Sequence, residues 1–138
     1  MKSSTISFKP LQEDDLELLC KWLDKPHVKE WWNDGLSHDE IKEKYRKRID
    51  NNTIVPYIAY LDDKPIGFIQ YYHAEKVGNG WWPDQPEGAV GIDQFIGEKD
   101  FINRGHGTKM IRAFSKKLFE NPTVKKIITD VAPNQYEP

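Results

Sequence analysis

The sequence predicts a single domain of the α/β (α+β) class, in which helices flank a mixed β-sheet. Its 138 residues suit one domain with one hydrophobic core. Two runs rich in β-branched and aromatic residues, 53–61 and 66–72, are joined by a short polar turn, which is typical of an antiparallel hairpin. Further along, a strand, a glycine-rich turn, a helix and another strand follow one another, and this order indicates a βαβ unit.

Hydrophobic periodicity and turn residues place the elements along the chain. Residues 13–23 carry apolar side chains at the i, i+3, i+4 and i+7 positions of an amphipathic helix, and Ser37 with Glu40 forms a capping box for a second helix. Residues 27–35 and 74–88 are predicted loops. The predicted elements are a strand at 6–9, helices at 13–23 and 37–49, the hairpin strands, a strand at 89–97, a helix at 108–120 and a strand at 126–131.

The composition is that of a globular protein, with 38% hydrophobic and 30% charged residues. A net charge of −2 argues against a nucleic-acid partner, and no apolar run approaches the ~20 residues that span a bilayer. We therefore expect a cytoplasmic protein with no membrane partner. The single cysteine, Cys20, lies on the apolar stripe of a predicted helix, where we expect a buried thiol.

Charge is divided between two neighbouring segments. Residues 73–100 hold six acids and two bases, whereas residues 101–126 hold seven bases and one acid. This division suits a cationic substrate that meets an anionic cofactor, and two solvated faces of opposite sign are the alternative explanation.

Two pairs of adjacent tryptophans, Trp31-Trp32 and Trp81-Trp82, fall in the predicted loops, the second pair close to Asp84 and Glu87. Aromatic rings and carboxylates can clamp a cationic ligand by stacking and by charge-assisted hydrogen bonds. The alternative is that the rings cover the edge of the core.

The glycine-rich turn Gly105-His106-Gly107 leads into a helix at Thr108, so its backbone amides and the helix dipole can converge on an anion. It matches neither a P-loop nor a full dinucleotide fingerprint, which leaves a purely structural helix entry as the alternative. Asp93, on the strand before the turn, is a candidate base for an amine substrate. A strand-end acid without a chemical role is the other interpretation.

The six residues Ile102 to Gly107 resemble the Gln/Arg-x-x-Gly-x-Gly/Ala motif of the GCN5-related N-acetyltransferase (GNAT) superfamily, with Ile102 in the leading position. A longer series resembles the aminoglycoside 6′-N-acetyltransferases over roughly residues 8–134. The matching segments are Glu30-Trp31-Trp32, Pro56-Tyr57-Ile58-Ala59, Pro65-Ile66-Gly67, Gly80-Trp81-Trp82, Gly91-Ile92-Asp93-Gln94, Gly105-x-Gly107-Thr108-Lys109 and Leu118-Phe119.

The resemblance implies a GNAT-like, mostly antiparallel sheet and transfer of acetyl from acetyl-CoA to the 6′-amine of an aminoglycoside, with Asp93 as the catalytic carboxylate and no metal. The implied substrate-binding residues are Trp31, Trp32, Asn79, Trp81, Trp82, Asp84, Glu87 and Gln94. The implied cofactor-binding residues are Phe95, Ile96, Gly97, Ile102, Asn103, Arg104, Gly105, His106, Gly107, Thr108, Lys109 and Asn134.

The superfamily continues with a further helix and strands at the point where this sequence ends, Pro138. We therefore expect one GNAT-like domain over residues 1–138 that is truncated at its C-terminus and lacks those last elements, in a monomer or a homodimer. An inactive cofactor- or ligand-binding module, or an acetyltransferase for another amine, remains an alternative to the aminoglycoside enzyme.

Overall fold

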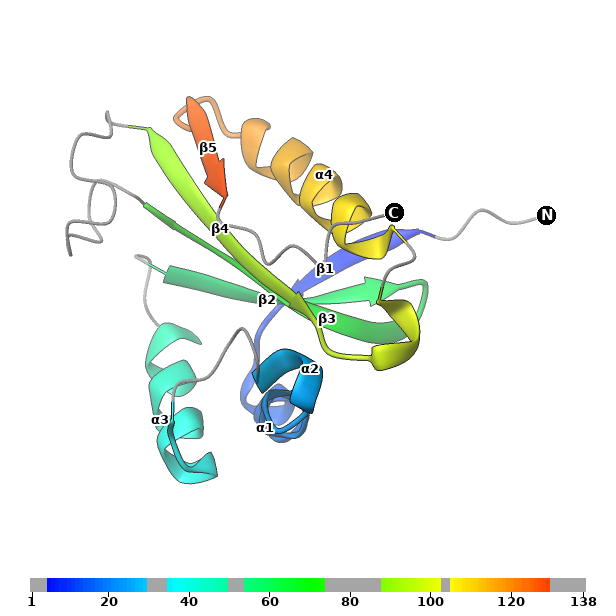
Figure 1. Cartoon of the computed structure of the whole chain (residues 1–138). Helices are drawn as coiled ribbons and strands as arrows, with labels where there is room; N and C mark the ends of the chain where they lie inside the picture. The colour runs from blue at the N-terminus through cyan, green and yellow to red at the C-terminus, as the bar shows by residue number, and fades with distance from the viewer. Residues whose placement is uncertain (1–4, 30–34, 50–53, 74–87, 103–104, 130–138) are drawn as a thin grey trace.

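A five-stranded sheet in the order β1-β2-β3-β4-β5 forms the centre of the protein in a computed structural model (Figure 1). The structure describes residues 5–29, 35–49, 54–73, 88–102 and 105–129. The strands are β1 (Ile6–Pro10), β2 (Ile54–Leu61), β3 (Lys64–His73), β4 (Ala89–Ile96) and β5 (Lys126–Thr129). The first three pairings are antiparallel and the pairing of β4 with β5 is parallel, so the predicted mixed, mostly antiparallel sheet is confirmed.

Helices cover both faces of this sheet (Figure 1). A 3-10 turn at Glu13–Asp15 leads into α1 (Leu16–Leu23), and α2 (Pro26–Lys29) and α3 (His38–Ile49) follow on the same face. The long helix α4 (His106–Phe119) lies on the opposite face and connects β4 to β5. The predicted βαβ unit is therefore confirmed.

Two expectations about local structure were wrong. The loop predicted from residue 27 is helical as far as Lys29, because Pro26 occupies the first helical position, where its fixed φ suits a helix, and Val28 is buried. The hairpin turn contains only Asp62 and Asp63, and Lys64 already belongs to β3. Asp62 adopts a left-handed φ of 55°, and its carboxylate accepts a hydrogen bond from the amide of Thr5 at 3.0 Å.

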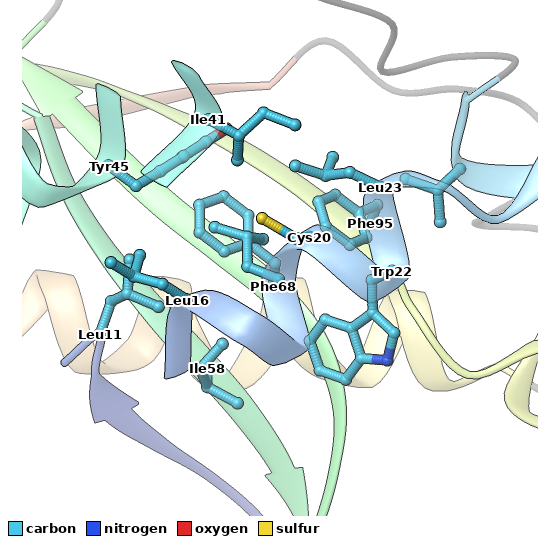
Figure 2. Packing of buried hydrophobic residues seen from close by; sticks show 12 residues of the cluster. Leu11, Leu16, Cys20, Trp22, Leu23, Ile41, Tyr45, Ile58, Phe68 and Phe95 are labelled. Atoms are coloured by element: carbon cyan, nitrogen blue, oxygen red, sulfur yellow. The ribbon is translucent and has the colours of Figure 1, made fainter. Parts of the chain in front are cut away.

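The core has two parts, one on each face of the sheet. On the α1–α3 face, Trp22 and Tyr45 pack against Phe68 and Phe95, and Cys20 is buried beside them as predicted (Figure 2). On the α4 face, Met110 and the rest of the apolar stripe of α4 cover the sheet side chains Ala59, Ile66, Ile69, Val90, Ile92 and Ile96. Alternation along the strands thus divides the apolar residues between two layers.

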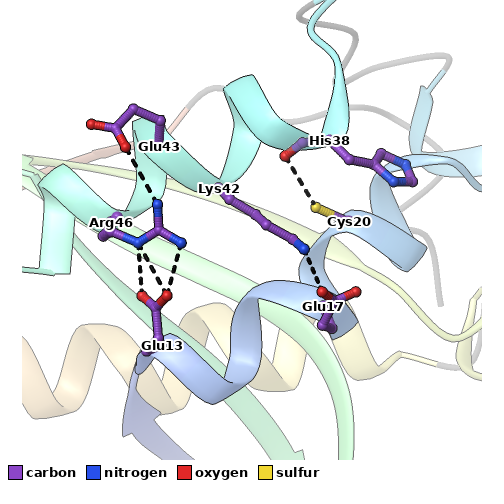
Figure 3. Close-up of polar contacts among 7 residues, drawn as sticks. All are labelled: Glu13, Glu17, Cys20, His38, Lys42, Glu43 and Arg46. Atoms are coloured by element: carbon purple, nitrogen blue, oxygen red, sulfur yellow. Dashed lines mark hydrogen bonds and ion pairs between the residues drawn. The ribbon is translucent and has the colours of Figure 1, made fainter.

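Ion pairs join α3 to the 3-10 turn and to α1 (Figure 3). Arg46 binds Glu13, with 2.8 Å between Nη2 and Oε1, and Lys42 binds Glu17. The predicted capping box is confirmed, because the Ser37 amide donates to Glu40 Oε1 at 3.0 Å and the Glu40 amide donates to Ser37 Oγ at 3.2 Å. The two ion pairs hold α3 against the 3-10 turn and α1, and the capping box stabilises the start of α3.

None of the helices that the structure describes is long and apolar enough to cross a membrane.

Candidate active site

Adjacent residues of β4 point polar side chains to opposite faces of the sheet. Asp93 lies on the face that α1–α3 cover and is half-buried, whereas Gln94 lies on the α4 face and is buried. Successive side chains of a strand alternate in this way, so a single strand can present one group to each face. Asp93 and Gln94 therefore belong to different halves of the candidate site.

Asp93 faces Gln70, its direct partner in the register of β3 and β4. The Gln70 amide nitrogen Nε2 donates to Asp93 Oδ2 at 3.3 Å, and Gln70 Oε1 accepts a hydrogen bond from Arg48 Nη1 at 3.0 Å. Gln70 is only 4% exposed. A cation on α3 and a carboxylate on β4 are thus linked through one buried amide.

Tyr72 lies beside this group, on the same face of β3 as Gln70. Its ring occupies the space over Gly91, the residue opposite it in β4 and two positions before Asp93. A Cβ atom at Gly91 would come within 2.1 Å of the Tyr72 ring, so any side chain there would displace the ring. Glycine at position 91 therefore allows an aromatic wall next to the carboxylate.

On the other face, Gln94 connects β4 to the glycine-rich turn. Its Nε2 donates to the carbonyl of Gly107, in the first turn of α4, at 2.8 Å. Gly105 is the N-cap of this helix with a left-handed φ of 79°, and its carbonyl accepts the amide of Lys109 at 3.0 Å. The strand and the positive end of the helix are therefore held in one fixed relation.

After the last residue that pairs with β5, two further residues of β4 direct their backbone groups to the same edge of the strand. In the described residues, β5 pairs with β4 only from Ala89 to Ile92. The Gly97 amide donates to the Ile66 carbonyl of β3 at 2.8 Å. Because antiparallel strands alternate their hydrogen-bonding side, Phe95 and Gly97 turn their backbone towards β3, and Gln94 and Ile96 turn theirs to the β5-side edge.

His27 of α2 contacts this edge. Its Nε2 lies 3.0 Å from the carbonyl oxygen of Ile96, which can only accept, so Nε2 is the donor. The Phe95 side chain lies in the core, stacked on Phe68 with a centroid distance of 5.3 Å. Of the three strand residues that we expected to bind a cofactor, Ile96 is therefore the one whose backbone faces the β5-side edge, and the backbone of Gln94 faces the same edge.

A fit to acetyl-CoA can be judged from the residues around the turn. Gln94 Oε1 is buried and has no hydrogen-bond partner within the described part of the chain, so it can accept from an amide of a bound molecule. Lys109 and Arg112 are exposed on α4 at i and i+3, where cations suit phosphates. The half-buried Ile102, His106 and Thr108 lie close to the same turn in sequence. These features fit an anionic, amide-containing co-substrate.

Ten of the predicted site residues lie outside the described residues. They are Trp31, Trp32, Asn79, Trp81, Trp82, Asp84, Glu87, Asn103, Arg104 and Asn134. Among the residues that the structure does describe, no group of three or more His, Cys, Asp or Glu side chains could hold a metal ion.

Three residues near the site were not predicted from the sequence. Gln70, Arg48 and His27 contact Asp93, Gln70 and Ile96, respectively. Gln70 had a signal in the sequence, because a glutamine inside the apolar run 66–72 occupies a position that alternation assigns to the core and therefore needs a polar partner. Arg48 and His27 had none, because their contacts depend on how α2 and α3 lie on the sheet.

The family model described as acetyltransferase (GNAT) domain matches residues 12–135, and the chain belongs to this family. Within it, the chain is similar to aminoglycoside N(6′)-acetyltransferase type 1 of Klebsiella pneumoniae, with 34% identity over 96% of this chain and 68% of that protein. It is also similar to the N-hydroxyputrescine acetyltransferase of Acinetobacter baumannii, with 25% identity over 83% of this chain and 54% of that protein.

Solved structures show the same relationship. The crystal structure of the aminoglycoside acetyltransferase AAC(6′)-Ib with coenzyme A and kanamycin superposes with a TM-score of 0.85 and 36% sequence identity, covering 94% of this chain and 76% of that chain. The structure of AAC(6′)-Ib with ribostamycin and coenzyme A gives a TM-score of 0.86 and 35% identity, covering 94% of this chain and 75% of that chain.

Proposed function

We propose that this protein transfers the acetyl group of acetyl-CoA to the 6′-amine of an aminoglycoside. The observation that carries the proposal is the similarity to aminoglycoside N(6′)-acetyltransferases along nearly the whole chain, both in sequence and in structure. The geometry of β4 supports it, because this strand places a carboxylate on one face and fixes the glycine-rich turn on the other.

Acetyl-CoA would bind along the edge of β4 and the start of α4. The backbone groups of Gln94 and Ile96 would pair with the pantetheine arm, in the way that a strand pairs with its neighbour. The amides at the start of α4, with Lys109 nearby, would hold the pyrophosphate. The proposal includes Ile102, Asn103 and Arg104 because they belong to the family motif. It includes Asn134 because the wider resemblance to the aminoglycoside 6′-N-acetyltransferases implies it.

Asp93 would act on the amine. Its carboxylate would bind the substrate ammonium and accept a proton from it, directly or through water, so that the neutral nitrogen can attack the thioester carbonyl. A backbone amide on β4 that is not paired with the pantetheine arm would donate to the oxyanion that forms. The carbon–sulfur bond then breaks, the acylated nitrogen loses its remaining extra proton, and the departing thiolate takes up a proton, so that an amide and a free thiol leave.

The aminoglycoside would lie on the α1–α3 side of β4, beside Asp93 and Tyr72. The tryptophans at 31, 32, 81 and 82 and the acids Asp84 and Glu87 would line its cleft, because rings and carboxylates suit a polycationic sugar. Asn79 would contribute a neutral polar contact to the same cleft. Because acetyl-CoA is a cytoplasmic metabolite, we further propose that the enzyme acts in the cytoplasm, as a monomer or a homodimer.

A thiol-release assay tests the proposal. We expect release of coenzyme A with kanamycin, and with an aminoglycoside that carries an amine at the 6′ position, but not with the matched compound that carries a hydroxyl there. Spermidine serves as the control for a simple polyamine. Equal rates with the amine and hydroxyl compounds would contradict the 6′ assignment, and a faster rate with spermidine would favour another acceptor.

The alternative of an inactive ligand-binding module has its own outcome. Calorimetric titration that detects acetyl-CoA binding while no acceptor gives turnover would support a binding protein. Failure of acetyl-CoA to bind would contradict both functions.

A further inference from the structure

Three polar side chains from three different elements form a line that ends at Asp93. Arg48 comes from α3, Gln70 from β3 and Asp93 from β4, and the two hydrogen bonds that connect them measure 3.0 and 3.3 Å. We propose that Gln70 is a positioning residue, polarised by Arg48, that fixes the Asp93 carboxylate and stabilises its ionised form. This inference rests on the proposed role of Asp93 as the acceptor of the amine proton.

The chemistry of the three side chains determines which atom donates and which accepts in each of the two hydrogen bonds. A guanidinium has donors only, so the Gln70 atom that faces Arg48 must be the carbonyl oxygen. The amide nitrogen is then directed at Asp93, whose ionised carboxylate has acceptors only. Each end of the Gln70 amide therefore has a single suitable partner, and an amide flip would lose both hydrogen bonds.

The two hydrogen bonds strengthen each other. Donation by Arg48 to the Gln70 oxygen draws electron density from the amide and makes its N–H groups better donors, as expected for a chain of hydrogen bonds in a low-dielectric site. Gln70 is 4% exposed, so water does not replace these partners. The ionised form of Asp93 gains from this donor, whereas the protonated form gains less.

Arg48 is itself held in place. Its guanidinium carbon lies 4.8 Å from the centroid of the Tyr45 ring, one turn earlier on α3. Tyr45 is buried and packs edge-on against Phe68 of β3, with 5.6 Å between ring centroids. The pair Arg46–Glu13 additionally joins α3 to the start of the α1 segment (Figure 3). The guanidinium of Arg48, which donates the first of the two hydrogen bonds, is therefore held in a fixed position.

Other titratable groups lie on the elements that pack around β4. Tyr72 is the neighbour of Gln70 on the same face of β3, and Lys44 Nζ lies 5.6 Å from the centroid of the Tyr45 ring. His27 of α2 contacts the β4 carbonyl of Ile96, and Glu98, after β4, accepts the indole N–H of Trp22 at 2.6 Å. Arg48 is thus the cation whose hydrogen bond reaches Asp93 through Gln70.

The test is an NMR titration of the Asp93 carboxyl carbon in protein labelled at aspartate, with the resonance identified by its loss in Asp93→Asn. We expect Gln70→Met, which keeps the length of the side chain, to raise the pKa of Asp93 by roughly one unit because a donor to its ionised form is removed. Arg48→Met should raise it by less. Lys47→Met, which removes an exposed cation of the same helix, should leave it unchanged.

An Asp93 titration that is the same in the wild type, Gln70→Met and Arg48→Met would overturn the inference. If Gln70→Met fails to fold, Arg48→Met decides alone, since Arg48 is only half-buried. The titration requires no turnover, so it stands apart from the proposed function, which fails if the wild-type protein transfers no acetyl group.

Kinetics give a second readout. In Gln70→Met we expect kcat/KM for kanamycin to fall about tenfold, the change that follows from losing a hydrogen bond to a charged group, and KM for acetyl-CoA to stay the same. The acid limb of the pH profile should move to higher pH. Equal losses for both substrates, without a shift of the acid limb, would indicate a merely structural role and contradict the inference.

Discussion

Gln94 donates a hydrogen bond from its side-chain amide to the carbonyl of Gly107 at 2.8 Å, and so connects the C-terminal half of β4 to the first turn of α4. The preceding residue, Asp93, points to the opposite face and meets Gln70. One strand therefore fixes both the proposed base and the turn that would receive the pyrophosphate. A change in the position of β4 would affect the two halves of the site together.

Removal of the Gln94–Gly107 contact should weaken the binding of acetyl-CoA. In Gln94→Leu, the Gly107 carbonyl loses its hydrogen-bond donor, and the glycine-rich turn is no longer attached to β4. The loss of a typical hydrogen bond costs about 1 kcal/mol of free energy. We expect the Kd for acetyl-CoA, measured by calorimetry, to rise about fivefold, because ~1 kcal/mol corresponds to that factor. An unchanged Kd would contradict the assigned role of this contact.

Because Gly105 has a left-handed backbone conformation, we predict that replacing it with a residue that has a side chain strains the turn. Among the described residues that are not its neighbours in the chain, none has an atom within 4 Å of a Cβ at this position, so Gly105→Ala mainly adds backbone strain. The penalty for a left-handed alanine is about 1 kcal/mol, which should appear as a lower free energy of unfolding in urea. Gly105→Asn should lose less, because asparagine tolerates this region better. Equal losses for the two variants would contradict the argument from φ.

We predict that a side chain at position 91 lowers the stability of the protein, because the Tyr72 ring occupies the space over Gly91. Gly91→Ala brings a methyl group within 2.1 Å of that ring, and relief of the overlap should cost ~1–3 kcal/mol of stability, as overpacking does. Most of that cost should disappear in a Tyr72→Ala background, where the ring is absent. A double-mutant cycle by urea unfolding measures this coupling, and strictly additive effects would argue against the contact.

The Arg46–Glu13 pair predicts a pH dependence of stability. The hydrogen bond from Arg46 holds the pKa of Glu13 below its ordinary value, and the hydrogen bond from Lys42 does the same for Glu17. A carboxylate with a lowered folded-state pKa contributes stability above its unfolded pKa and loses that contribution as the pH falls through the folded pKa. Arg46→Met should therefore lower the urea midpoint at neutral pH.

That difference should shrink as the pH falls below the usual range of a glutamate, and it should be small throughout because both groups are exposed. Lys47→Met, on the exposed side of the same helix, is the matched control. An Arg46→Met effect of the same size at neutral and acidic pH would show that the pairing is not its cause.

Much of the fold could be predicted from local sequence. The apolar stripe of α4 and the β-branched strands on either side of it were sufficient for the βαβ unit, because periodicity and turn residues are local signals. The short helix α2 was missed because four residues, of which only Val28 is buried, carry too little periodicity. The sequence was interpreted as a loop from residue 27 onwards, although the proline at position 26 is well suited to the first turn of a helix.

The site was predictable only in part, for a physical reason. Asp93 and the turn at Gly105–Gly107 were singled out because each has a chemical signature within a few residues. Gln94 was expected among the substrate ligands, but strand alternation directs its side chain to α4, where it holds Gly107. The link from Arg48 to Asp93 depends on the register of β3 with β4 and on the position of α3, which no local pattern encodes.

The central claim, acetyl transfer to one particular amine, is tested most directly by two-dimensional NMR of the product formed from kanamycin and acetyl-CoA. We predict a single acetyl group on the 6′ nitrogen, and no product with Asp93→Asn under the same conditions. An acetyl group on a different nitrogen, or the same product at an undiminished rate with Asp93→Asn, would contradict the account.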